Sequence, residues 1–274
     1  MNLQEKIVIL GMTDTGKVRQ KNEDSIGYDS ALGLVVLADG MGGHRGGEVA
    51  SSLAVDVIIS TIQQQLSQTT QKKTDSKSEF TLESIYLRDA VRSANKQVFE
   101  KAETNPEQKG MGTTVVALLF HNGTLSLVHI GDSRCYRLRG SKLEQITKDH
   151  SLLQELVDRG FYTSEEAQKS VKKNLVTRAL GIDQNVKVDL LEDFVLKEDI
   201  YLLCSDGLTD LIDDTDIYLT INKFSDNLEK AAVQLITMAN QKGGKDNISV
   251  MLCRVDEDFS TRMAWIRKII AWFD

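Results

Sequence analysis

The stretch from Thr113 to Ile130 reads Thr-Thr-Val-Val-Ala-Leu-Leu-Phe-His-Asn-Gly-Thr-Leu-Ser-Leu-Val-His-Ile. It contains two apolar runs, Thr113 to Phe120 and Thr124 to Ile130, joined at His121-Asn122-Gly123. Asn-Gly between apolar runs is the strongest short-range signal of a β-hairpin, because both residues tolerate a positive φ. The stretch therefore predicts two adjacent antiparallel strands, and short apolar runs after it continue the meander.

Helical patterns occupy separate blocks of the chain. Apolar residues recur at helical spacing from Gly46 to Leu66, from Leu82 to Ala102 and from Leu228 to Asn240. In the second of these helices we expect Ile85 to be among the residues that face the core. Start and stop signals for short helices lie within Lys148 to Gly181, which predicts a small helical excursion between strands. Meandering strands with helices in separate blocks predict an α+β fold, with an antiparallel sheet system flanked by helices.

Length and composition set the class of protein. The chain has 274 residues, of which 41% are hydrophobic, enough for one large domain with a substantial core. A net charge of -7 argues against nucleic acid as a partner, because phosphate-backbone binding favours a basic surface. Cys135, Cys204 and Cys253 form no close pair, which is typical of buried thiols in a reducing compartment. The run Ile7 to Leu10 is too short for a signal peptide or a membrane span, so we expect a cytoplasmic protein.

Four short apolar runs begin or end at an aspartate beside glycine or asparagine. Three of them lead into Asp39-Gly40, Gly131-Asp132 and Asp206-Gly207, and Asp246-Asn247 opens the fourth. One such junction is an ordinary turn, but four in one chain predict a metal site, because buried strands hold carboxylates at fixed positions. Oxygen ligands without clustered His or Cys favour Mg²⁺ or Mn²⁺ over zinc, and shared carboxylates suit a site for two ions.

The polar segment from Thr13 to Asp24 carries Arg19, Glu23 and Asp24. It is either an ordinary surface loop or a part of the site. In the second interpretation the two carboxylates bind a metal or orient its waters, while the planar guanidinium of Arg19 binds phosphate oxygens. That combination suits a phosphoryl substrate above a metal centre.

The segment from Asp39 to Gly47 contains five glycines in nine residues. It is not a P-loop, because no Gly-Lys-Ser/Thr follows, and an antiparallel sheet does not fit a dinucleotide fingerprint. A tight turn remains, which brings the Gly40 carbonyl and the Asp39 carboxylate to one point. His44, the only histidine in the segment, is either structural or catalytic. Farther along the chain, Asp210 is expected to cap or stabilise the start of a helix.

Together these motifs resemble the metal-dependent serine/threonine protein phosphatases of type 2C, in their bacterial form. The matching motifs occur in the family's order between about Gly11 and Val255: Arg19 with Asn22-Glu23-Asp24, Ala38-Asp39-Gly40-Met41-Gly42-Gly43, Gly110-Met111-Gly112-Thr113-Thr114, Gly131-Asp132-Ser133-Arg134, Thr177-Arg178-Ala179-Leu180-Gly181, Ser205-Asp206-Gly207-Leu208 and Gly244-Lys245-Asp246-Asn247-Ile248-Ser249-Val250. The resemblance implies a four-layer αββα sandwich of two antiparallel sheets flanked by helices. It also implies a phosphatase domain over residues 1–257, with a flap at about 148–181.

Carried over position by position, the resemblance implies two tightly bound Mn²⁺ or Mg²⁺ ions and a weaker third. The implied ligands are Glu23, Asp24, Asp39, the Gly40 carbonyl, Asp206 and Asp246, with Asp132 joining Asp206 at the weaker site. Asp39 would bridge the two tight ions, and Arg19 would bind the substrate phosphate. A water between the two ions would attack the phosphoryl group in line.

One position departs from the wider family. Animal members carry histidine directly after the Asp-Gly pair, proposed as the general acid, where this chain has Met41. Methionine cannot donate a proton, so either His44 or a metal-bound water protonates the leaving oxygen. The sequence leaves both open.

The expected activity is the removal of phosphate from serine and threonine of phosphorylated proteins, by a monomer that opposes a cognate serine/threonine kinase. A non-catalytic module that recognises phosphoproteins and a phosphoesterase for small molecules are the alternatives. The first alternative would be expected to lose metal ligands, yet every carboxylate of the motifs is present.

Residues 258–274 form a tail in which apolar and aromatic residues alternate with Arg262, Arg267 and Lys268. The tail is too short to span a bilayer. It is either a helix packed on the domain, or an amphipathic helix that lies on a membrane surface or contacts a partner, or a segment after which the chain is truncated before a further domain.

Overall fold

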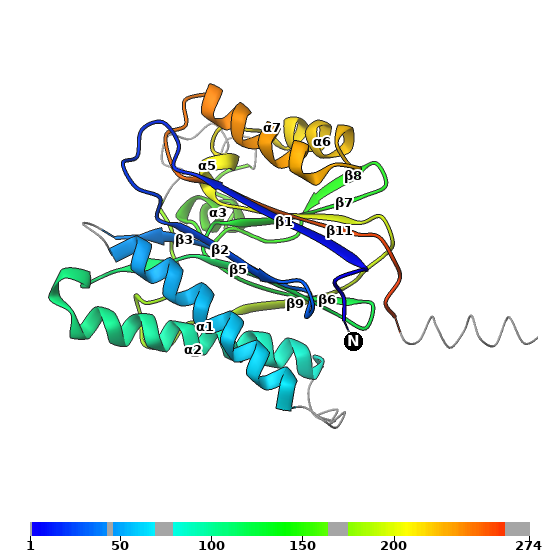
Figure 1. Ribbon diagram of the computed structural model, residues 1–274. Coiled ribbons are helices and arrows are strands. Elements are labelled where there is room, and N and C mark those ends of the chain that lie inside the picture. The colour runs from blue at the N-terminus through cyan, green and yellow to red at the C-terminus, as the bar shows by residue number, and fades with distance from the viewer. Residues whose placement is uncertain (1, 43–45, 69–78, 164–174, 261–274) are drawn as a thin grey trace, which may run out of the picture.

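The computed structural model describes residues 2–42, 46–68, 79–163 and 175–260. Two antiparallel sheets lie face to face, and helices cover the outer face of each (Figure 1). Sheet A has five strands in the order β1 (Ile7–Asp14), β11 (Ile248–Val255), β10 (Ile200–Cys204), β7 (Arg134–Arg139) and β8 (Lys142–Gln145). Sheet B has the order β2 (Asp24–Asp29), β3 (Leu34–Met41), β5 (Val115–His121), β6 (Thr124–Ile130) and β9 (Asp189–Phe194), with β4 (Gly112–Thr113) paired to β3. The predicted α+β sandwich is confirmed.

Helices form the two outer layers. Sheet B is covered by α1 (Gly46–Gln68) and α2 (Leu82–Thr104), and sheet A is covered by α6 (Asp214–Lys223) and α7 (Leu228–Gln241). A short 3₁₀ helix, η1 (Pro106–Gln108), follows α2. The three long helices expected from the sequence are present. Ile85 is only half-buried, however, because the inward stripe of α2 runs through Leu87 and Val91 instead, and both of these are fully buried.

Three apolar layers hold the sandwich together. Between the sheets, Leu37 of sheet B packs in the same cluster as Leu203 and Met251 of sheet A. On the outer side of sheet B, Val36 packs with α1 and α2. On the outer side of sheet A, Leu202 packs with α6 and α7. The central strands are thus buried on both faces, which explains why their sequences are continuous apolar runs rather than alternating patterns.

The hairpin between β5 and β6 forms as the sequence predicts. The strands pair from Val115 opposite Ile130 to His121 opposite Thr124. Asn122 has a φ of 47° and Gly123 a φ of 76°, so the two turn residues adopt the left-handed conformation that this connection requires.

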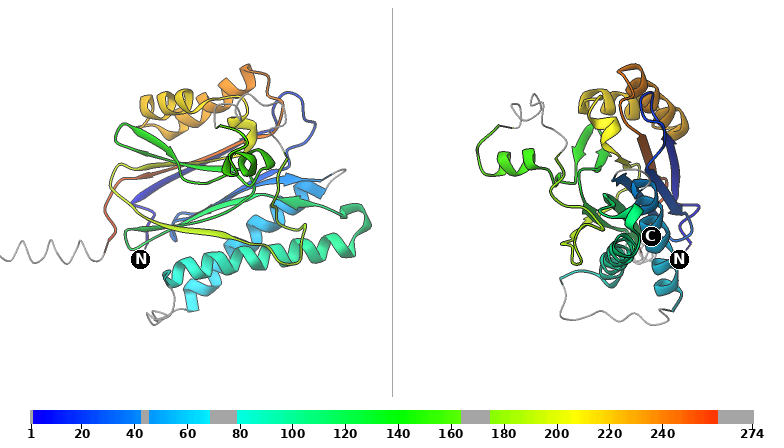
Figure 2. Two further views of the ribbon diagram at one scale, coloured as in Figure 1. Left: turned by 180° about the vertical axis from the view of Figure 1, so that it is seen from behind. Right: turned by 90° about the vertical axis from the view of Figure 1, so that its left-hand side faces the viewer.

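The excursion between sheet strands contains α3 (Leu152–Asp158), which projects from the side of the sandwich (Figure 2). The Ser151 side chain accepts a hydrogen bond from the Gln154 backbone N–H at 3.2 Å, as the sequence predicts for a cap. A second helix start is predicted at Thr163-Ser164-Glu165-Glu166, and most of it falls on residues 164–174, which lie outside the described residues. Short helix α5 (Asp206–Thr209) has Asp210 as its C-terminal cap residue, so the expectation that Asp210 caps a helix start is wrong. Asp213 caps the start of α6 instead.

Most of the C-terminal tail, residues 261–274, also lies outside the described part of the chain. Phe259, which the sequence analysis assigns to the tail, is 2% exposed and packs edge-to-face against Phe120 at a centroid distance of 6.4 Å. Within the described ranges, every helix is too short or too polar to cross a lipid bilayer.

Candidate active site

Two aspartates face each other at one end of the sandwich. Asp39, near the end of β3, is directly opposite Asp24, the first residue of β2. Burial, followed by the charges of Asp24 and Asp206, raises the pKa of Asp39 well above its ordinary value. Burial likewise raises the pKa of Asp24 to about 6. Like charges that face each other across a strand pair are destabilising, so this pair needs a nearby cation when both carboxylates are ionised.

Two further aspartates extend the negative cluster. Asp206 begins α5 directly after β10, and Asp132 follows β6. Burial raises the pKa of Asp206, with the charge of Asp132 as the next cause. Burial and the Asp149 charge raise the pKa of Asp132 to about 6. Asp206 and Asp39 keep part of their surface open to solvent, whereas Asp24 and Asp132 are each 8% exposed, so the cluster has an open side.

Arg19 and Asp246 form the solvent side of the cluster. The Arg19 Nη2 atom donates to Asp246 Oδ2 at 2.6 Å, and 52% of the Arg19 side chain is exposed. An ion pair this exposed is worth only about 0–1 kcal/mol, so the guanidinium is free to exchange this carboxylate for another anion. The charge of Asp246 also acts on Asp39 and Asp206 from this side.

Tight backbone packing sets the floor of the site at Gly40. A Cβ atom on Gly40 would lie 2.2 Å from the Gly47 carbonyl oxygen and 2.5 Å from that of Glu23, so no side chain fits. Next to it, the Asp39 backbone N–H donates to Thr114 Oγ1 at 3.0 Å, and the Thr114 N–H donates back to the Asp39 carbonyl at 2.9 Å. Glu23 is half-buried beside this floor. Burial raises its pKa above the ordinary value, and the positive charge of Arg19 offsets only part of this rise.

The donors and charges of the site fit a hard divalent cation. Asp24 Oδ1 is buried without a hydrogen-bond partner, and its Oδ2 accepts from Ser205 Oγ at 2.8 Å. Within the described ranges, no three Asp, Glu, His or Cys side chains already converge on one point as a finished ligand set. The fit therefore lies in the oxygen-only donors, the buried like charges and the unsatisfied carboxylate oxygen, all of which a cation would relieve.

The loop that carries Asp132 is tied to both ends of the helical excursion. The Gly131 N–H donates to His150 Nδ1 at 3.0 Å, and the His150 N–H donates to the Gly131 carbonyl at 2.8 Å. From the far end of the excursion, the Thr177 N–H donates to the His150 carbonyl, and Arg178 bonds to Asp189 at 2.7 Å beside the same imidazole. The excursion is thus attached directly behind Asp132.

The structure brings together most of the residues that the sequence singles out. Charge interactions link Asp24, Asp39, Asp132, Asp206 and Asp246, while Glu23 and Arg19 interact at their rim. His44 lies outside the described residues. Sequence reasoning missed the roles of four polar neighbours: Thr114, His150, Ser205 and Asn247. Three of them stand inside quoted motifs, whereas His150 lies within the helical excursion.

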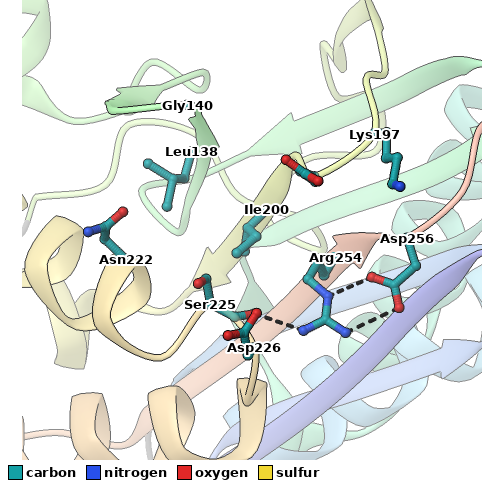
Figure 3. Close-up of a pocket in the computed structure, with 10 residues that line it drawn as sticks. Leu138, Gly140, Lys197, Ile200, Asn222, Ser225, Asp226, Arg254 and Asp256 are labelled. Atoms are coloured by element: carbon teal, nitrogen blue, oxygen red, sulfur yellow. Dashed lines mark hydrogen bonds and ion pairs between the residues drawn. The ribbon is translucent and has the colours of Figure 1, made fainter.

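A separate pocket lies at the end of sheet A where β10 begins with Ile200, whereas Asp206 follows the other end of that strand. Figure 3 shows the residues that line the pocket. It has a volume of about 580 Å³ and is lined by the β7–β8 turn, the end of β11 and the loop after α6. Its Arg254 is already bonded to Asp256 and to the Ser225 carbonyl. The pocket shares no residue with the carboxylate cluster.

Comparison with known proteins agrees with this geometry. Residues 16–241 match the Protein phosphatase 2C family. The serine/threonine phosphatase stp of Listeria welshimeri is 37% identical over 88% of this chain and 92% of its own, and the phosphatase PstP of Mycobacterium tuberculosis is 40% identical over 90% of this chain and 45% of its own. The crystal structure of M. tuberculosis PstP/Ppp matches with a TM-score of 0.81 and 37% identity over 92% of this chain and 100% of that one. The chain belongs to the protein phosphatase 2C family.

Proposed function

We propose that this protein is a metal-dependent protein serine/threonine phosphatase. The observation that carries the proposal is the cluster of desolvated aspartates from separate segments, open to solvent on the side where Arg19 lies. A cluster of this kind repels a phosphate monoester unless cations are present, and with cations it becomes a phosphate-binding surface.

The relatives support the same activity. The proteins from Listeria and Mycobacterium are named serine/threonine phosphatases, and a structure of the PstP catalytic domain, 38% identical with a TM-score of 0.78 over 92% of this chain and 99% of its own, contains 2 manganese ions. We infer that Mn²⁺ or Mg²⁺ serves this chain as well, held by Glu23, Asp24, Asp39, the Gly40 carbonyl, Asp206 and Asp246, with Asp132 at a weaker third site. When bound, such ions supply an activated water and neutralise charge on the phosphoryl oxygens.

The chain's own residues would divide the remaining work. Asp39 and Asp24 face each other at the centre of the negative cluster, so their charges would attract the cations to this point. Arg19 would exchange Asp246 for two oxygens of the substrate phosphate, which its planar guanidinium matches, and would stabilise the charge that develops on them. Met41, which follows Gly40 on β3, has no proton to donate. Proton delivery to the leaving oxygen therefore falls to His44 or to a bound water.

The test is an assay of the purified protein on a phosphothreonine peptide with Mn²⁺, followed by addition of EDTA. We expect turnover that EDTA abolishes and that excess Mn²⁺ restores. The same preparation is then assayed on small metabolite phosphates. Turnover that survives EDTA contradicts the metal mechanism, and faster turnover of metabolites than of peptides would favour a small-molecule phosphoesterase.

The partners follow from the same proposal. The substrates would be phosphorylated proteins, and the opposing enzyme a serine/threonine kinase. The free thiols Cys135, Cys204 and Cys253 are all buried, which fits a reducing compartment and hence the cytoplasm. We further propose that the protein is a monomer and that its basic tail contacts a membrane surface or a partner.

A further inference from the structure

The loop between β1 and β2, residues 15–23, carries both Arg19 and Glu23. It lies beside α5 at one end of the sandwich (Figure 1). Its residues 17–21 are exposed, and between Lys17 and Lys21 it has no regular secondary structure. A loop of this kind positions a guanidinium only if something outside it fixes its backbone.

The side chain of Asn247 supplies that fixation. Its Nδ2 atom donates to the Thr15 carbonyl at 3.0 Å and to the Lys21 carbonyl at 2.8 Å. Its Oδ1 atom accepts from the Glu23 N–H at 2.8 Å. A primary amide has two N–H donors and one carbonyl acceptor, so each N–H and the oxygen are engaged with this loop. Asn247 is 5% exposed, which strengthens these bonds relative to exposed ones.

The bonds are placed on both sides of Arg19. Thr15 precedes it by four positions, and Lys21 follows it by two, so the amide closes the loop around the arginine. Asn247 is also bonded through its backbone N–H to Asp246 Oδ1 at 2.8 Å, the carboxylate whose other oxygen accepts from Arg19. One residue therefore sets the loop and its carboxylate relative to each other.

The rest of the loop lies on the same segment. The Lys17 and Val18 N–H groups both donate to the Gly244 carbonyl, at 2.8 and 3.2 Å. A Cβ atom on Gly16 would lie 2.2 Å from the Asp246 carbonyl oxygen, so the two backbones are in direct contact. These contacts hold the first half of the loop. In the second half, the Asn247 amide holds Lys21 and the Glu23 N–H, while Asn22 Nδ2 donates to Thr13 Oγ1 at 2.7 Å and the Glu23 carbonyl accepts from Ser51 Oγ at 2.6 Å.

We propose that Asn247 is a positioning residue that fixes the Arg19 and Glu23 loop over the carboxylate cluster, so that the substrate phosphate meets Arg19 at the metal site. The proposal rests on the phosphatase activity proposed above. Asn247 itself touches no substrate; it acts through the loop.

The chain offers a matched control in Asn95 of α2. Its Nδ2 atom donates to the carbonyls of Asp183 and Gln184 at 3.0 and 3.1 Å, and its Oδ1 atom accepts from the Gly181 N–H at 2.9 Å. At 2% exposed, it is as buried as Asn247 and makes the same three kinds of bond to a different loop. Asn95→Ala thus removes an equivalent clamp away from Arg19.

Kinetics on a phosphothreonine peptide with Mn²⁺ test the proposal. Asn247→Ala should raise KM and lower kcat/KM by about 10- to 100-fold. Asn95→Ala should lower kcat/KM by less than about 3-fold, although the two variants lose a comparable amount of Tm. In an Arg19→Ala background, Asn247→Ala should lower kcat/KM by a clearly smaller factor than in the wild-type background, because Arg19, one of the two groups that it positions, is gone. Equal kinetic effects of the two asparagine variants, or full additivity of Asn247→Ala with Arg19→Ala, would overturn the proposal.

A second readout does not depend on activity. Lys17, Arg19 and Lys21 are trypsin sites within the loop, and local opening controls their cleavage. Asn247→Ala should speed cleavage there by about tenfold or more, while Asn95→Ala leaves it at the wild-type rate. Unchanged cleavage refutes the clamp even if the protein is an active phosphatase. Faster cleavage in a protein without phosphatase activity would keep the clamp and reject the proposed function.

Discussion

Asp132→Asn should stabilise the metal-free protein while lowering its turnover. The pKa of Asp132 rises from 3.8 to about 6 on folding, mainly because the carboxylate is buried. At a pH above both pKa values, ionised Asp132 therefore lowers the free energy of unfolding by about 3 kcal/mol. An asparagine of the same shape carries no charge and removes that loss. For a domain of this size we expect a rise in Tm of about 6–10 °C at pH 7 in EDTA.

The sign of the pH dependence follows from the raised pKa. Between pH 3.8 and 6 the folded state binds more protons at Asp132 than the unfolded state, so the wild-type protein loses stability as the pH rises through this window. The advantage of Asp132→Asn should therefore shrink from about 3 kcal/mol at pH 7 to about 1 kcal/mol at pH 4.5. Thermal unfolding of both proteins in EDTA, followed by circular dichroism at several pH values, measures it.

The control is Asp56→Asn, which removes the same charge from an exposed position on α1. Asp56→Asn should leave the difference in the free energy of unfolding between pH 7 and pH 4.5 the same as in the wild-type protein. With Mn²⁺ present, Asp132→Asn should keep the tight ions in a calorimetric titration and lose the weak one, together with most of the turnover. A Tm that is equal to wild type at pH 7, or higher by the same amount at every pH, would refute the burial argument. Loss of the tight ions would refute the assignment of Asp132 to the weaker site.

Two further substitutions separate the parts of the site. Asp39→Asn should abolish Mn²⁺-dependent turnover but leave the far-ultraviolet circular dichroism unchanged, because it removes the charge at the centre of the cluster; near-native activity would contradict the assignment of Asp39. Arg19→Ala should raise KM for a phosphopeptide and lower kcat/KM by roughly 10- to 1,000-fold, about 1.4–4 kcal/mol, through loss of charge-assisted hydrogen bonds. Calorimetry should find Mn²⁺ affinity little changed in Arg19→Ala, and a large loss of that affinity at unchanged KM would mean that Arg19 organises the carboxylates instead.

Elements whose signals are local could be predicted from the sequence. The β5–β6 hairpin depends on Asn122 and Gly123, whose positive φ values are a property of the two residues themselves. Strands β2 and β9 were not predicted, because both are edge strands with polar residues and incomplete burial. Their sequences are Asp-Ser-Ile-Gly-Tyr-Asp and Asp-Leu-Leu-Glu-Asp-Phe. Such strands are stabilised by the neighbour they pair with, which lies elsewhere in the sheet.

The sequence by itself singled out the aspartates that the structure gathers into one cluster, because an aspartate beside glycine or asparagine at the end of a buried run is visible without a structure. It did not determine which of these residues lie opposite each other. The register that sets Asp24 opposite Asp39, the ion pair between Arg19 and Asp246, and the clamp of Asn247 on Thr15 join residues up to 232 positions apart. Local propensity acts over a few residues, whereas contacts at such separations form only when packing of the two sheets brings the ends of their strands together.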